Sequence, residues 1–336
     1  MLLAKLNYRV CVGLMDHRRP ARISLDNGVN KMGEKVKVIE SWIGACAGCE
    51  VSVLDLHETL LDVLAKIEFV YIPVLMDTKH PPKATVGIVS GGVRNSDNLK
   101  ELLEIRKQCD ILIALGSCAC FGGTPGLANL HNLNELLDEV YVTTKSTKND
   151  INRLPYMDGL PTLLPDMRPA SDYVKVDVMI PGCGPNPAMI GAAVMSLLGG
   201  APYELSKKSV CDECPREKSE RNIHKVLRPF EGTPDDKKCL FEQGYLCSGS
   251  ATRAGCGAKC PSSGAACRGC FGPTENSSEQ GAAMLCAVTS CYGLDDDPTV
   301  DLDKMVAEIY DPIGNFYKYT LPVSFLTKKV TEKVKN

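Results

Sequence analysis

The 336-residue sequence has little net charge, few aromatic residues and no long uninterrupted apolar run. Its formal net charge is −3 at pH 7, so we expect no basic surface that would hold a nucleic-acid backbone. The best candidate for a membrane helix, residues 176–198, is interrupted by proline and glycine, and we therefore expect no membrane span. The length of 336 residues suits two domains of ordinary size or one large one. Hydrophobic residues make up 44% of the chain, which is enough to form a hydrophobic core.

We also expect no export signal. Arg18 and Arg19 form a pair that is typical of twin-arginine signals, but an apolar segment follows such a pair in a working signal. Here the next residues are largely polar, so we expect a cytoplasmic location. Residues 1–34 are interpreted as an N-terminal extension: either an arm that packs on a partner, or a stretch that precedes a working start at Met32.

Cysteine, in contrast, is abundant, with 17 residues. Disulfides are rare in the reducing cytoplasm. In that compartment, cysteines in pairs and clusters are typical of metal binding or redox chemistry.

Residues 35–200 alternate between strand-like and helix-like stretches. Apolar, β-branched runs predict strands at 36–42, 69–75, 85–90, 110–115 and 174–180. Apolar residues at helical spacing predict helices at 51–67, 99–108 and 188–198. This alternation predicts an α/β fold, with a doubly wound parallel sheet and helices on its faces.

Three of the predicted strands end in loops that contain cysteine. These are Cys46 and Cys49 after the first strand, Cys118 and Cys120 after the fourth, and Cys183 after the fifth. Because the carboxyl ends of parallel strands meet at one edge of a sheet, we expect these thiols to lie close together. Neighbouring glycines allow close approach of the backbone, and four thiolates are the usual ligands of a 4Fe–4S cluster. The alternative is a set of small buried thiols in turns.

After about residue 201 the periodicity fades, and Cys, Gly, Ser, Pro and charged residues dominate as far as residue 294. A segment of this composition forms no large apolar core, and its many cysteines favour a metal-stabilised domain over disorder. Residues 300–330 regain apolar content and are expected to pack back on the body of the protein.

Eight cysteines of this second half fall into two groups of four. The first group is Cys211, Cys214, Cys239 and Cys247, and the second is Cys256, Cys260, Cys267 and Cys270. Each group suits a 4Fe–4S cluster, and two zinc sites with the same ligands are the alternative. Five cysteines have no assigned role: Cys11, Cys109, Cys120, Cys286 and Cys291. Cys109 precedes a buried strand, and we interpret it as a plain core thiol.

At these cysteines the sequence resembles the small subunit of nickel–iron hydrogenases. The first matching motifs are Cys46-Ala47-Gly48-Cys49, Gly116-Ser117-Cys118-Ala119-Cys120-Phe121-Gly122-Gly123 and Pro181-Gly182-Cys183-Gly184-Pro185-Asn186-Pro187. The later ones are Cys211-Asp212-Glu213-Cys214-Pro215-Arg216, Cys239-Leu240-Phe241, Cys247, Cys260-Pro261 and Cys267-Arg268-Gly269-Cys270. The resemblance is strongest to the cytoplasmic methyl-viologen-reducing type that feeds heterodisulfide reductase. Small subunits of electron-bifurcating bacterial hydrogenases are a close second.

The resemblance implies a flavodoxin-like domain over residues 35–200, followed by a smaller, irregular iron–sulfur domain over residues 201–336. It implies a proximal cluster at Cys46, Cys49, Cys118 and Cys183, and a distal cluster at Cys211, Cys214, Cys239 and Cys247. The medial cluster maps to Cys260, Cys267 and Cys270, and Cys256 is well placed as the fourth ligand.

This sequence departs from the family pattern at two of these positions. Cys211 stands where many members have histidine, and Cys256 supplies a fourth thiol where many members hold a three-iron cluster. An added thiolate makes a cluster more negative and lowers its reduction potential. Both departures suit the transfer of low-potential electrons to a soluble acceptor.

The function implied by the resemblance is that of an oxidoreductase subunit. It would carry electrons from a nickel–iron centre in a separate large subunit to a downstream iron–sulfur or flavin acceptor subunit, and it would be active only with the large subunit. Glu50, beside Cys49, would then lie near a proton path, although an acid favoured by the dipole at a helix start is the preferred interpretation.

Two other functions compete with this one. The related quinone-reductase subunit typically has adjacent cysteines and one cluster, whereas this chain has no Cys-Cys pair. The other alternative is a zinc-stapled interaction protein without a redox role.

Overall fold

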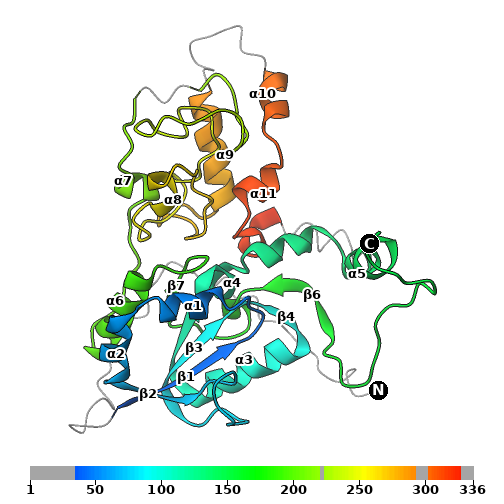
Figure 1. Cartoon of the computed structure of the whole chain (residues 1–336), viewed down its shortest axis with the longest axis vertical. Coiled ribbons are helices and arrows are strands. Elements are labelled where there is room, and N and C mark those ends of the chain that lie inside the picture. The colour runs from blue at the N-terminus through cyan, green and yellow to red at the C-terminus, as the bar shows by residue number, and fades with distance from the viewer. Residues whose placement is uncertain (1–34, 220–222, 293–301, 327–336) are drawn as a thin grey trace.

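The computed structural model of the chain describes residues 35–219, 223–292 and 302–326. A lower body is built on a parallel sheet, and an upper body consists of loops and short helices (Figure 1). Residues 1–34, with the arginine pair, Met32 and Cys11, lie outside the described residues. Within the described ranges no helix is both long enough and apolar enough to cross a membrane.

Five parallel strands form the main sheet, in the spatial order β2-β1-β3-β5-β7. They are β1 (Val36–Trp42), β2 (Ile67–Tyr71), β3 (Ala84–Ser90), β5 (Cys109–Leu115) and β7 (Val178–Ile180). Numbered among themselves, these strands follow the order 2-1-3-4-5 of a flavodoxin-like sheet. The predicted doubly wound α/β fold is therefore confirmed.

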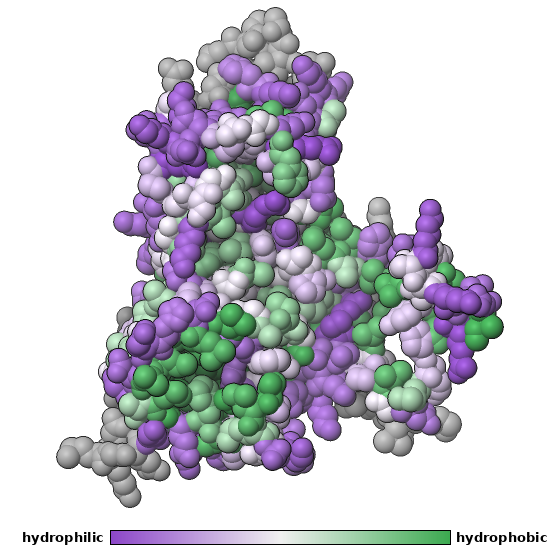
Figure 2. All heavy atoms as spheres, viewed as in Figure 1, coloured by the Kyte–Doolittle hydropathy of each residue, from purple (hydrophilic) through white to green (hydrophobic). Residues whose placement is uncertain are grey.

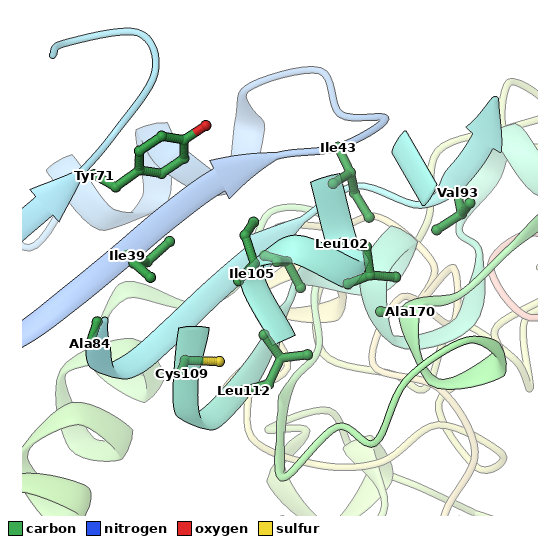
Figure 3. Close-up of a cluster of buried hydrophobic side chains, with 11 residues drawn as sticks. Ile39, Ile43, Tyr71, Ala84, Val93, Leu102, Ile105, Cys109, Leu112 and Ala170 are labelled. Carbon is green, nitrogen blue, oxygen red and sulfur yellow. The ribbon is translucent and has the colours of Figure 1, made fainter. Parts of the chain in front are cut away.

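The sheet alternates its apolar side chains between two faces. Ile39 and Leu112 point toward α3 (Ser96–Gln108), where they pack with Leu102 and Ile105 (Figure 3). On the other face lie side chains such as Ile113, packed against α6 (Pro187–Leu198). Each face buries apolar area against a helix, which gives the sheet its two cores.

The predicted helix over residues 51–67 is wrong in one respect, because the structure has two helices there. They are α1 (Gly48–Leu54) and α2 (Glu58–Leu64). His57 between them has a φ of 50°, which a continuing right-handed helix does not allow. The following strand, predicted at 69–75, ends at Tyr71, and Leu75 is 78% exposed.

A long insertion separates β5 from β7, and no local sequence pattern predicted its elements. It contains α4 (Gly116–Phe121), η2 (Thr124–Leu130), α5 (Leu133–Asp138), η3 (Glu139–Thr143), β6 (Leu163–Arg168) and η4 (Ala170–Asp172). Strand β6 pairs in antiparallel fashion with β4 (Val93–Asn95). Residues 131–163, here called the arm, project to the right in Figure 1.

The upper body contains more apolar packing than its composition predicts. Its helices are α7 (Val210–Glu213), α8 (Lys259–Ser262), α9 (Gln280–Cys291), α10 (Leu302–Glu308) and α11 (Pro312–Phe316), followed by η5 (Leu321–Val323). Met284 and Val288 of α9 are fully buried in a cluster that includes Ile223 and Phe316. The cluster combines residues far apart in the sequence, so no local window reveals it.

The C-terminal stretch packs on the lower body, as predicted for residues 300–330, over its described part. The N–H of Gly123 donates to the carbonyl of Tyr319 at 3.1 Å. Pro322 lies where a Cβ on Gly122 or Gly126 would stand, so these glycines make room for it.

Candidate metal-binding sites

The first set of thiols gathers at the carboxyl edge of the sheet. Cys46 and Cys49 follow β1, Cys118 lies in α4 after β5, and Cys183 follows β7. Burial raises the pKa of the Cys49 thiol, and the Glu50 carboxylate and the three other thiols raise it further. The four side chains thus share one electrostatic environment at the predicted edge. Cys46 and Cys183 are exposed there.

Two glycines make room for this first set. Gly116 has a φ of +83°, and a Cβ there would overlap the Sγ of Cys49. Gly123 has a φ of +62°, and a Cβ there would stand 2.5 Å from the Sγ of Cys118. Both the backbone angle and the space exclude larger residues, so the loops can hold a bulky inorganic group close to the backbone.

The Glu50 side chain is turned inward. It lies in the first turn of α1, as a helix-start acid would, but it is only 9% exposed. One carboxyl oxygen accepts a hydrogen bond from Ser90, and the other has no partner in the described part of the chain. Burial and then the Glu50 charge raise the pKa of Glu40 to about 7. The sequence did not point to Glu40, because one acid in a strand is usually solvated.

The second set lies in the upper body around α7. Burial first, and then the Cys247 thiol, raise the pKa of Cys211 to about 12, with smaller effects from Cys239 and Cys214. A Cβ at Gly249 would stand 3.2 Å from the Sγ of Cys211 and 3.7 Å from that of Cys247. All four predicted members of this set are therefore neighbours.

The third set lies between the other two. Burial raises the pKa of Cys270 to about 12, and the thiols of Cys256, Cys260 and Cys183 act in the same direction. The Cys256 sulfur accepts backbone N–H groups from the start of α8. Cys267 is buried at the border of the second set, where its N–H donates to the Sγ of Cys247 at 3.3 Å.

Side chains outside the predicted sets tie the sets together. The Ser117 hydroxyl donates to the carbonyl of Cys270 at 2.5 Å. Glu213, the last residue of α7, accepts from the N–H groups of Gly255 (2.8 Å) and Gly257 (3.0 Å), on either side of Cys256. The sequence pointed to neither Ser117 nor Glu213, because such long-range contacts leave no local pattern.

The remaining cysteines lie apart from these groups or beside them. Cys109 is buried in the core below α3, as predicted. Cys120 is buried next to the first set and donates to the carbonyl of Ala114 at 3.4 Å. Cys286 is exposed on α9, and Cys291 packs on the apolar cluster of the upper body.

The donor sets consist of thiols, with backbone N–H groups and glycines beside them. Among the described residues, no group of three or more His, Cys, Asp or Glu side chains has the arrangement that would hold a single metal ion. All-thiol sets in glycine-rich loops fit the ligation of a four-iron cluster, in which each thiolate binds a different iron. In Figure 1 the elements of the first set (α1, α4, β7) lie below those of the other two (α7, α8).

Comparisons with known proteins show which family the chain belongs to. Residues 46–197 match the family model described as NADH ubiquinone oxidoreductase, 20 Kd subunit. An F420-non-reducing hydrogenase subunit of Methanothermobacter thermautotrophicus is 39% identical over 309 residues, which cover 90% of this chain and 100% of the relative. The iron-sulfur subunit of the F420-non-reducing hydrogenase of Archaeoglobus profundus is 33% identical over 321 residues, covering 88% and 99%.

A solved structure is also similar. A chain of an NAD+-reducing NiFe-hydrogenase in the H2-reduced state is 31% identical, and the match covers 51% of this chain and 96% of that chain with a TM-score of 0.49.

The sheet, its thiol-bearing edge and the sequence matches define a nickel–iron hydrogenase small subunit, a component of an oxidoreductase. Within that class, the chain belongs to the family formed by these iron–sulfur subunits of F420-non-reducing hydrogenases.

Proposed function

We propose that this chain is the electron-transfer small subunit of a cytoplasmic nickel–iron hydrogenase. It would hold three 4Fe–4S clusters between a large subunit with the nickel–iron centre and a downstream iron–sulfur or flavin acceptor subunit. The flavodoxin-like domain would be residues 35–200, and the iron–sulfur domain residues 201–336.

The proposed ligands follow the three sets of thiols. The proximal cluster takes Cys46, Cys49, Cys118 and Cys183, the medial cluster takes Cys256, Cys260, Cys267 and Cys270, and the distal cluster takes Cys211, Cys214, Cys239 and Cys247. Such clusters supply one-electron transfer when bound.

The observation that carries this proposal is the succession of the sets. The N–H of proximal Cys183 donates to the sulfur of medial Cys270, and the N–H of medial Cys267 donates to the sulfur of distal Cys247. Adjacent sets are thus in direct contact through their own ligand residues. This contact between adjacent sets suits electron transfer from one set to the next, which a zinc-stapled protein does not require.

The surface around the proximal set supports a protein partner there. Helix α1, which contains Cys49, exposes Val51 (53%) and Leu54 (64%), and α2 exposes Leu61 (68%). Figure 2 shows hydrophobic atoms gathered over the lower body and on the arm. Exposed apolar patches of this kind mark interaction sites, and a large subunit would cover the exposed proximal thiols.

Metal analysis of protein purified without oxygen tests the proposal. We expect about twelve irons and a matching amount of labile sulfide per chain, since each set suits one four-iron cluster. A protein that carries mainly zinc would be an interaction module instead. About four irons would indicate a single cluster, as in the quinone-reductase relatives.

A further inference from the structure

Arg216 is buried in the upper body, only 6% exposed, although it carries a permanent positive charge. Its Nε donates to the carbonyl of Pro261 at 2.7 Å. Its Nη1 donates to the carbonyls of Asp235 at 2.6 Å and Lys238 at 3.0 Å. These three acceptors are neutral peptide oxygens.

The guanidinium group lies among the ligand loops of two different sets. Arg216 itself follows Cys214 by two residues, Lys238 directly precedes Cys239, and Pro261 directly follows Cys260. One side chain therefore joins two distal loops and one medial loop.

Within residues 35–219, 223–292 and 302–326, no carboxylate pairs with this charge. Among the described residues, no ion pair joins Arg216 to an Asp or Glu side chain, whereas the half-buried Arg106 pairs with Asp177 at 2.6 Å. Carbonyl oxygens satisfy its hydrogen bonds but carry no net charge. A buried cation without a counter-charge is costly, so this position requires an anion nearby.

We infer that Arg216 is a positioning residue whose charge is balanced by the distal and medial clusters, and that it raises their reduction potentials. This inference rests on the proposed function. A 4Fe–4S cluster with four thiolate ligands is an anion that becomes more negative on reduction. A fixed positive charge in a low-dielectric interior therefore stabilises the reduced form more than the oxidised form. It partly offsets the effect of the thiolate at Cys211.

Two substitutions separate charge from hydrogen bonding. Arg216→Gln removes the charge and keeps one donor group, whereas Arg216→Lys keeps the charge and loses the planar fork. Lys218→Gln is the matched control, because Lys218 donates to the carbonyl of Cys211 from an exposed position where solvent screens its charge. All three are made in the complete complex with its large subunit.

The measurement is a redox titration of each cluster, followed by electron paramagnetic resonance, together with iron content. We expect Arg216→Gln to shift the distal and medial midpoints to more negative potential than in the wild type, and Lys218→Gln to shift them less. Arg216→Lys should keep both midpoints close to the wild-type values. Wild-type midpoints with full iron in Arg216→Gln would overturn the inference.

Loss of clusters is also informative. If Arg216→Gln fails to load iron, full loading in Arg216→Lys supports the requirement for charge, whereas loss in both variants means that only the hydrogen-bond fork matters and refutes it. A wild-type complex without four-iron clusters would instead refute the proposed function itself.

Discussion

Burial sets the chemistry of the individual cysteines. It is the largest contribution to the raised pKa of Cys118, about 11, and to that of Cys211, about 12. Thiols with such pKa values stay protonated at neutral pH until a metal binds them as thiolates. Cluster insertion should therefore release protons.

Cys256 is the proposed fourth ligand of the medial cluster. Its sulfur accepts two backbone N–H groups, and Glu213 anchors the glycines on both sides. We expect Cys256→Ser to convert the medial cluster to a three-iron form of higher potential, because one thiolate ligand is lost. Electron paramagnetic resonance of the oxidised variant should show a new three-iron signal.

The matched control for this variant is Cys286→Ser. Cys286 is exposed on α9, and its replacement should leave the spectrum unchanged. A three-iron signal in Cys286→Ser, and none in Cys256→Ser, would exchange the assigned roles of the two cysteines.

At the scale of elements, a single carboxylate connects β5, β7 and α3. Asp177, whose side chain is 6% exposed, accepts from the N–H of Leu112 at 2.9 Å, from Arg106 at 2.6 Å and from Lys175 at 2.9 Å. Burial alone would raise its pKa, but these hydrogen bonds outweigh it and hold the pKa of Asp177 below its usual range. The carboxylate thus fastens the edge strand that leads to Cys183.

A depressed pKa makes this stabilisation dependent on pH. It is complete above the pKa of the unfolded chain and is lost as the pH falls through the folded pKa. We expect Asp177→Asn to lower the free energy of unfolding by about 3 kcal/mol at pH 7, because a buried charged pair is broken. The difference from the wild type should shrink as the pH falls from about 5 toward 3.

Unfolding midpoints across this pH range measure the effect. Asp110→Asn is the control, since Asp110 is exposed on the neighbouring strand and its removal should change stability by less than about 0.5 kcal/mol. A difference between Asp177→Asn and the wild type that stays constant down to pH 3 would contradict the role of the ionised carboxylate.

At the scale of the whole molecule, the proximal set lies at an open edge. Small residues surround it and give it little side-chain cover: Gly44, Ala45, Ala47, Gly48, Gly122, Gly123 and Gly184. An isolated subunit would leave a cluster there accessible to water and oxygen. An obligate partner would cover this edge over an interface of about 2,000 Å² or more.

We therefore expect the chain expressed alone to be poorly soluble or to lose the proximal cluster, and to show no hydrogen uptake. Co-expression with a matching large subunit should restore solubility and hydrogen-dependent viologen reduction. Iron content, gel filtration and a viologen assay measure these outcomes. A stable, fully loaded monomer that oxidises hydrogen without a partner would refute this prediction.

The sequence by itself determined that five strands form the main sheet and that cysteines follow three of them, although β2 ends at Tyr71 rather than at residue 75 and β7 begins at Val178 rather than at residue 174. Runs such as Val36–Trp42 are rich in apolar and β-branched residues. A strand of a parallel sheet is buried on both faces, so such a run is the sequence pattern expected for it. Neighbouring cysteines in a short loop can bind the same metal group, so the spacing of the cysteines along the sequence predicted the groups of thiols. The break at His57 and the elements of the arm were not predicted, and the burial of α9 was not because its packing partners lie far away in the sequence.

Only the tertiary structure decided which loops meet. The contacts of Ser117 with Cys270 and of Arg216 with Pro261 join segments that are 153 and 45 residues apart. A serine or arginine beside a cysteine has the same local pattern whether it is solvated or buried. Its role follows from the surroundings that folding brings to it, since burial turns an ordinary surface charge into one that needs a counter-charge.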